Sequence, residues 1–566
     1  AGGIISSALH YSPIFPVYNA DGTYSFAQNS WSSDTRTTLP NGSVTSGNGQ
    51  TQAWNPVALA MLNKNNQDEL KLIANAFVEA AIYRGIKYRM NFGVDLGSQR
   101  NDEFSPSTIP LSNTAGNPES EATGNSSTAL RKNYVWEHTL NITKRLGAHS
   151  IEGLAGWTIQ KYHSDANSVN ATKGFISNQI TTLNAGVVTN GSSSASEWSL
   201  ASGLARVQYS YLSKYLLTAA MRADGSSRFG TNNKWGYFPS FSAGWRLSKE
   251  EFLRSVEQIT ELKIRASYGF TGNFNIPNYG ALGELSYNGY VLGGTVPTVI
   301  NGASPSSRPN PDLTWEKTEQ LNIGIDGSFF RNALTLTLDL YNSNTDGLLL
   351  NVPVPLSTGF STELRNIGKV NNKGIEITLG TQQNFGSVKW DATINYAKNI
   401  NKVISLGPGN ADIINTGGTN NTYFLTRVGY PIGSYYLPIV LGVFKSQSEI
   451  DSYPHYTDAA TNYDLATSKP GDFKFLDADG DGVIDFTKDR VIIGSYMPKF
   501  TYGFNSTLAW RNLDLSFALQ GVQGNKIINL ARRYFFNAEG NMNNYAQVYT
   551  GRYIDEAHPG NGVNRA

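Results

Sequence analysis

Apolar and polar residues alternate strictly along many short stretches of this chain. In residues 88–97, for example, Tyr88, Met90, Phe92, Val94 and Leu96 alternate with Arg89, Asn91, Gly93, Asp95 and Gly97. Successive side chains of an extended strand point to opposite faces. The stretch therefore predicts a strand with one apolar face and one polar face.

Several of these stretches come in pairs separated by very short turns. The turns fall at residues 331–332 and 511–512, and around residues 145–149, 212–214 and 384–387. Each pair predicts an antiparallel hairpin, and unpaired strands of the same kind are expected at 241–247 and 262–270. We count roughly 13 strands, several of them near the ~10 residues that cross a tilted bilayer.

Long polar segments separate the pairs, at residues 162–202, 272–317, 342–373 and 398–498. Short turns on one side and long loops on the other are typical of an outer-membrane barrel, with the long loops outside the cell. The fold class expected is therefore all-β, a large antiparallel transmembrane β-barrel with an extracellular loop region at 398–498. The alternative is a soluble β-sandwich or propeller, although the repeat of about 40 to 50 residues typical of propellers is not found.

A barrel satisfies the backbone in hydrocarbon because closing the sheet pairs every strand edge. Its outer face must be apolar, and its inner face can hold charged residues such as Arg89, Asp95, Arg222, Asp326 and Asp339. Four tryptophans, Trp136, Trp157, Trp390 and Trp510, are expected near strand ends, where an interfacial girdle would place them. A soluble core would also accept them.

Composition narrows the function classes. The chain has no cysteine, which excludes disulfides and thiolate sites, and its 45 basic and 44 acidic side chains give a net charge of +1. That balance lacks the basic surface of a nucleic-acid-binding protein. The longest apolar run, at 435–444, is too short for a membrane helix and contains Pro438.

One motif carries a candidate metal site. The stretch DADGDGVID places Asp477, Asp479, Asp481 and Asp485 at the first, third, fifth and ninth positions of an EF-hand-like loop, where Val483 would lend its carbonyl oxygen. Lys488 stands at position twelve instead of glutamate, and Asp489 comes one residue later. Both a structural Ca²⁺ site and an aspartate-rich turn without metal remain open.

Enzyme signatures are poor. The six histidines show no zinc-type pairing, and His138 falls inside an alternating strand, where it would line the barrel. The run GPGNAD from Gly407 follows no βαβ pattern, and Asp224 with Arg222 and Arg228 fits an ion-pair network in the lumen better than a catalytic cluster. No enzymatic activity is expected.

A set of longer motifs resembles one family. They are ADGSSRFGTNNKWGYFPSFSAGWRLSKEEF from Ala223, LKIRASYGFTGN from Leu262, NPDLTWEKTEQLNIGID from Asn310, LRNIGKVNNKGIEITLG from Leu364 and GDFKFLDADGDGVIDFTKDRVIIGSYMPKFTYGF from Gly471. Together with ALHYSPIFPVYNADGTYSF from Ala8, they resemble the SusC-like (SusC/RagA) TonB-dependent outer-membrane transporters, in the same order.

The resemblance implies a barrel of about 22 strands with a plugged lumen. Residues 1–566 would then be a partial barrel domain without the N-terminal plug and the last strands. It also implies import of an oligosaccharide or oligopeptide, driven by TonB through a region outside this chain, with a SusD-like surface lipoprotein as partner. A scaffold or assembly barrel without transport is the first alternative, and a soluble carbohydrate-active β enzyme is the second.

Overall fold

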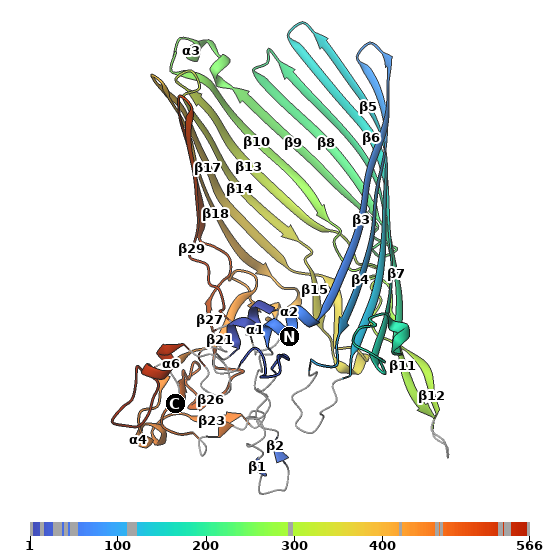
Figure 1. The fold of residues 1–566 in the computed structure, drawn as a ribbon. Coiled ribbons are helices and arrows are strands. Elements are labelled where there is room, and N and C mark those ends of the chain that lie inside the picture. Colours follow the sequence, from blue (N-terminus) through green and yellow to red (C-terminus); the bar gives the residue numbers. More distant parts are fainter. Residues whose placement is uncertain are drawn as a thin grey trace.

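The main element of the protein is one antiparallel sheet of fourteen strands, seen in a computed structural model (Figure 1). The structure describes residues 4–11, 16–25, 37–38, 44–45, 55–109, 121–292, 298–417, 422–458, 463–464, 468–529, 532, 536 and 545–562. Within those residues, no helix has the length and apolar content needed to cross a membrane.

The strands of this sheet follow one another in chain order, with insertions between some of them, of which the segment at 406–499 is the longest. They are β3 (Lys64–Tyr83), β4 (Ile86–Ser105), β5 (Thr123–Leu146), β6 (His149–Lys173), β7 (Val187–Tyr211), β8 (Tyr215–Ser226), β9 (Trp235–Arg246), β10 (Ile259–Asn273), β13 (Glu316–Phe329), β14 (Leu334–Asp346), β17 (Lys369–Phe385), β18 (Val388–Ser405), β28 (Phe500–Trp510) and β29 (Leu513–Gln523).

Tight turns gather at one end of the sheet, which we call the short-turn end. All five turns predicted from the sequence are there, and three of them use non-glycine residues with positive φ, such as Leu212 (φ 53°), Arg331 (φ 57°) and Arg511 (φ 54°). The longer connections lie at the opposite, long-loop end. The predicted asymmetry between the two ends is therefore confirmed.

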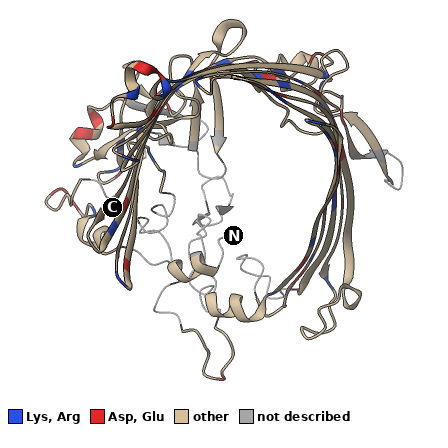
Figure 2. Cartoon of the chain, turned by 90° about the horizontal axis from the view of Figure 1, so that it is seen from above, with Lys and Arg blue, Asp and Glu red and all other residues tan. Residues whose placement is uncertain are grey.

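The sheet bends into a wall that surrounds most of a ring when seen from above (Figure 2). Strands β3 and β29 are its two edges. A two-layer sandwich is excluded, because all fourteen strands belong to a single continuous sheet.

The register gives the wall two chemically distinct faces. Paired residues share a face, so Trp157, His138, Met90 and Val78 lie in one row across β6, β5, β4 and β3. A second row runs Ile264, Ile325, Leu338, Ile377 and Tyr396. These rows belong to the apolar face. Arg89, Asp95, Arg222, Asp326 and Asp339 all fall on the opposite, polar face, as predicted.

The strands fall into two groups by length. The tall strands β3 to β7 have 20 to 25 residues, whereas the short strands β8 to β29 have 11 to 18. On β5 the apolar face is bounded by Lys132 and Lys144, which enclose about the 9 to 11 residues that a membrane-crossing strand needs. Beyond Lys132 the strand continues toward the long-loop end.

The observed lengths of the strands correct three predictions made from the sequence. Residues 162–202 are not a loop, because β6 continues to Lys173 and β7 begins at Val187. The segment outside the sheet after β18 begins at residue 406, since β18 reaches Ser405 and not residue 398. Trp136 and Trp157 lie inside long strands, whereas Trp390 and Trp510 lie near the short-turn end.

The count of roughly 13 strands missed β3. Its stretch ELKLIANAFVEAA is rich in alanine, glutamate, lysine and leucine, which favour a helix. The ladder with β4 overrides that preference, and the alternation of Leu70, Leu72, Ala74, Ala76 and Val78 then provides its apolar face.

Smaller elements occupy the connections. They are the helices α1 (Ile4–His10), α2 (Pro56–Leu62), α3 (Glu251–Arg254), α4 (Gln447–Asp451) and α6 (Ala546–Gly551), and the strands β1 (Thr37–Thr38), β2 (Val44–Thr45), β11 (Leu285–Leu292), β12 (Thr298–Pro305), β15 (Leu349–Pro353), β16 (Thr362–Asn366), β19 (Ile413–Gly417), β20 (Thr422–Thr426), β21 (Ser434–Pro438), β22 (Val440–Val443), β23 (His455–Asp458), β24 (Tyr463–Asp464), β25 (Phe473–Phe475), β26 (Val483–Ile484) and β27 (Arg490–Gly494).

Compact cores hold the long-loop end together. One contains Phe229, Phe238, Ile276, Leu313 and Trp315, drawn from three connections and β9. A second, between β18 and β28 in the chain, consists of Phe444, Ile450 and Ile484 with Tyr453, Phe475 and Phe486 packed against it. The segment at 406–499 is thus a folded unit and not a simple loop.

Candidate functional site

The polar face carries ion pairs that reach across strands. The Arg265 guanidinium on β10 donates to both carboxylate oxygens of Asp339 on β14, at 2.7 Å each. It also donates to the Asp326 carboxylate on β13, at 3.1 Å. The Lys263 ammonium lies 3.4 Å from the same carboxylate. Fork-like pairing of this kind fixes the direction of the side chains.

Gly324 makes this crossing possible. It lies on β13 directly between Arg265 and Asp339 in the register. A Cβ atom at this position would overlap the Arg265 guanidinium, so only glycine leaves the path across β13 open.

A second pair lies on the polar face of β8, the short strand next to the tall strands. Arg222 on β8 donates to both oxygens of Asp224 at 2.8 Å and to the Ser202 hydroxyl of β7 at 3.0 Å. Asp224 is buried, and the pair fits the network predicted for the lumen. Arg228 does not join it: its guanidinium lies over the ring of Trp198, 4.9 Å from the centroid.

His138 lies on the apolar face, and not on the polar face where lining the barrel would place it. Its ring is stacked on Trp157 with centroids 4.1 Å apart, and its Nδ1 bonds the Tyr88 hydroxyl at 2.5 Å. The sequence could have shown this, because His138 alternates in step with Trp136 and Leu140, and residues two apart on a strand share a face.

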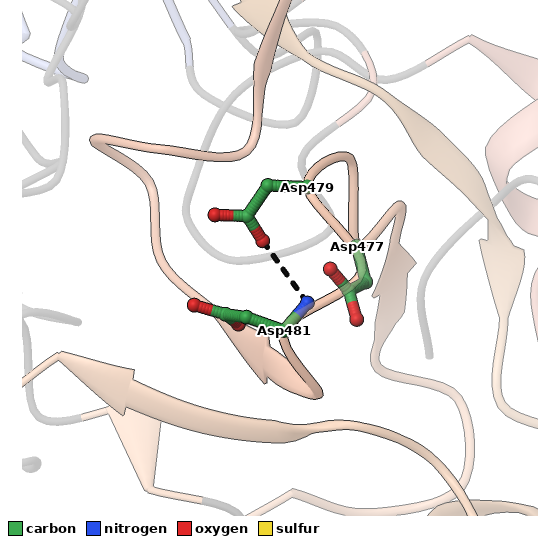
Figure 3. Close-up of side chains that lie close together, drawn as sticks. All are labelled: Asp477, Asp479 and Asp481. Atoms are coloured by element: carbon green, nitrogen blue, oxygen red, sulfur yellow. Dashed lines mark hydrogen bonds between the residues drawn. The ribbon is translucent and has the colours of Figure 1, made fainter.

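The aspartate loop, residues 477–489, lies at the long-loop end between β25 and β27. One oxygen each of Asp477, Asp479 and Asp481 lies within 4.8 Å of the others (Figure 3). Gly480 and Gly482 supply positive φ values of 75° and 81°, which let the chain curl around the three carboxylates. The three sequence-predicted residues are thus brought together.

Asp485 and Val483 take other roles in the loop. The Asp485 carboxylate accepts from the Thr487 hydroxyl and, at 2.6 Å, from the Thr487 amide, which lowers the pKa of Asp485. The Val483 amide donates to Asp481 at 2.9 Å. Lys488 contacts Asp481 at 3.2 Å, and this carboxylate raises the pKa of Lys488.

Asp489 closes the loop, a role that the sequence did not reveal. Its buried carboxylate accepts the amides of Ala478 at 2.7 Å and Asp485 at 2.6 Å. Asp489, one residue past position twelve of the EF-hand-like loop, therefore joins the two ends of the loop through hydrogen bonds from backbone amides. The residues present fit both a hard-cation site with three oxygen donors and a self-satisfied turn.

A single curved sheet of fourteen strands, with exposed apolar residues on one face and paired charges on the other, is typical of transmembrane β-barrels. Within that class, the chain belongs to the TonB-dependent receptor-like β-barrel family, whose model matches residues 10–553. The family consists of outer-membrane receptors and transporters and not of enzymes.

Relatives confirm the SusC-like resemblance. TonB-dependent receptor P3 of Formosa agariphila is 33% identical over 538 residues, covering 93% of this chain and 50% of that protein. TonB-dependent receptor SusC of Bacteroides thetaiotaomicron is 29% identical over 553 residues, covering 93% and 50%. The chain thus spans about half the length of the curated relatives it matches.

The fold also matches solved structures. The RagAB peptide transporter superposes with a TM-score of 0.75 at 22% identity, covering 93% of this chain and 56% of that chain. The predicted fold class is confirmed by this match and by the family model.

Proposed function

We propose that this chain forms most of the wall of an outer-membrane importer that takes up oligosaccharides or oligopeptides with energy supplied through TonB. The proposal is supported by membership of the TonB-dependent receptor family and by similarity to SusC. Nutrients of this size do not pass ordinary porins, so a wide, gated barrel serves them.

The observation that carries the proposal is the polar face. It holds paired charges, including Arg265 with Asp339 and Arg222 with Asp224, along a wall that curves around a common space. Charges on the side opposite the lipid require water, a plug or a hydrophilic solute next to them. A barrel of this kind suits passage of a polar molecule.

The partners follow from the same family. In this proposal the long-loop end lies outside the cell, where the folded unit at 406–499 and the hairpins β11–β12 and β15–β16 would meet a SusD-like lipoprotein. The short-turn end faces the periplasm. TonB is the energy-coupling partner in this proposal.

Growth tests examine import. The strain with the gene deleted is grown on a panel of oligosaccharides and oligopeptides as sole carbon source and compared with the complemented strain. We expect loss of growth on one oligomer class, restored by the intact gene only while TonB is present. Equal growth of all strains on every oligomer would contradict the proposal.

A scaffold function is the alternative, and the folded units of the long-loop end favour it. If the deletion leaves uptake unchanged but removes partner lipoproteins from complexes isolated from the outer membrane, then the barrel assembles proteins and does not transport.

A further inference from the structure

A groove crosses the apolar face near the short-turn end. It has a volume of about 510 Å³ and spans strands β7, β8, β9, β10 and β13. We call it the alanine groove, because its lining alternates the small side chains of three adjacent strands with larger apolar ones: Ala219, Ala243 and Ala266, with Val207, Tyr209, Leu217, Phe241, Tyr268 and Leu321.

The register explains the shape. Ala243 is paired directly with Ala266, and Ala219 is paired with Phe241 on the next row. Small side chains on three neighbouring strands leave a depression, while Phe241 and Tyr268 stand beside it with 58% and 40% of their surfaces exposed. A depression in a close-packed lipid environment must be filled, since empty space loses dispersion contacts.

A row of aromatic rings borders the groove toward the short-turn end. His149, Tyr211, Tyr215 and Trp245 lie on four consecutive strands, with ring centroids 4.8 Å, 6.3 Å and 6.4 Å apart. Such a row marks the interface between hydrocarbon and head groups. Beyond it lies Glu250, which accepts bonds from the Tyr215 hydroxyl at 2.7 Å and the Lys214 ammonium at 3.1 Å.

We propose that the alanine groove binds an acyl chain of a glycerophospholipid from the leaflet at the short-turn end. The surface offers an apolar channel and, at the short-turn end, a polar boundary, which suit the tail and the head group of a phospholipid. On the opposite side, the Tyr268 hydroxyl donates to Glu319 at 2.7 Å. The groove continues the lipid-facing surface of the barrel, so the bilayer supplies its occupant.

A second copy of the chain fits less well. A stable protein interface uses roughly 20 to 30 residues on each side, whereas the groove is lined by twelve. The inference depends on the barrel lying in a membrane and not on import, so it stands or falls separately from the proposed function.

Native mass spectrometry of the protein purified from outer membranes in mild detergent tests the proposal. We expect the wild type to retain a phospholipid, and the double variant A243F/A266F, which fills the groove, to lose it. Ala76→Phe on β3 is the matched control, since Ala76 lies on the same face, six strands away from Ala243. Heat-modifiable gel mobility checks that each variant is folded.

Photocrosslinking removes any dependence on the folding of the variants. Wild-type protein is reconstituted with phosphatidylethanolamine that carries a diazirine in its acyl chain, and labelled peptides are mapped. Label concentrated on β8 to β10 supports the groove, whereas label spread evenly over the apolar face overturns the proposal. Equal retention of lipid by wild type and A243F/A266F, or disruption of a dimer by that variant, also overturns it.

Discussion

The two halves of the wall build the long-loop end in different ways. On one side, the tall strands β3 to β7 run on past the apolar band as one continuous sheet. On the other, the short strands stop and separate folded units continue, including the one at 406–499 (Figure 1). The same membrane-crossing sheet thus supports two kinds of extension.

The difference shows what stabilises each extension. The middle part of this extension carries mainly Ser and Asn on both faces, as in NGSSSAS from Asn190 and SDANSV from Ser164, so the ladder stabilises it. At its end, the buried Phe104 packs against Phe175. The folded units depend on small cores such as that around Phe444. The following substitutions separate these contributions.

Phe444→Ala should have the largest effect. Phe444 is fully buried, and emptying its site should cost the folded unit at 406–499 about 3 to 5 kcal/mol. Limited proteolysis should cut this unit while the barrel keeps its heat-modifiable mobility. Phe385→Ala, at the exposed last residue of β17 near the short-turn end, is the control and should leave cleavage unchanged.

Leu336→Arg should come next. Leu336 lies on the apolar face of β14, and a charge on this face should cost up to roughly 2 to 4 kcal/mol, the value expected at the bilayer midplane. Thr337→Arg, one residue on and facing the polar side, should cost much less. Folding titrations of both variants in lipid measure the difference, and equal costs would contradict the assignment of the two faces.

Acid should weaken the junction between tall and short strands. Bonds from Tyr215, Trp245 and Lys214 lower the pKa of Glu250 to about 2. The stabilisation from Glu250 is therefore complete above its ordinary pKa of 4.5 and is lost as the pH falls toward 2. Thermal unfolding of wild type should fall over this range, and Glu250→Gln should show a flatter profile. A matching slope in the variant would exclude Glu250 as the cause.

Val169→Arg should have a small effect. Val169 on β6 and Val207 on β7 lie on the same face of the sheet. Val169, however, lies in the part of β6 that extends toward the long-loop end, where a charge stays hydrated. We expect a change within about 0.5 kcal/mol, against roughly 2 to 4 kcal/mol for Val207→Arg in the bilayer. Comparable losses at the two valines would place the extension inside the membrane.

Calcium binding by the aspartate loop stays a prediction, with the smallest effect. Isothermal calorimetry should detect heat at millimolar Ca²⁺, removed by D479N/D481N and kept by Asp451→Asn in the neighbouring helix α4. No heat in the wild type would leave the loop as a turn closed by Asp489.

Much of the wall could be predicted from the sequence, because lipid on one side and polar surroundings on the other impose strict alternation. The short turns followed from interrupted alternation. Three features could not be predicted. The composition of β3 favours a helix, and alternation disappears at the polar ends of β6 and β7 because both faces are hydrated there. The contacts by which Asp489 closes the loop depend on backbone amides elsewhere in the chain.

The unbroken ladders of β4, β5 and β6 have a mechanical consequence. The ladder between β4 and β5 has no register shift from the Phe104–Gly124 pair to the short-turn end. The ladder between β5 and β6 has none either. A rod of about 24 residues, roughly 80 Å long, therefore has no hinge. Any movement at the long-loop end is therefore expected in the folded units that continue the short strands, and not in the tall strands.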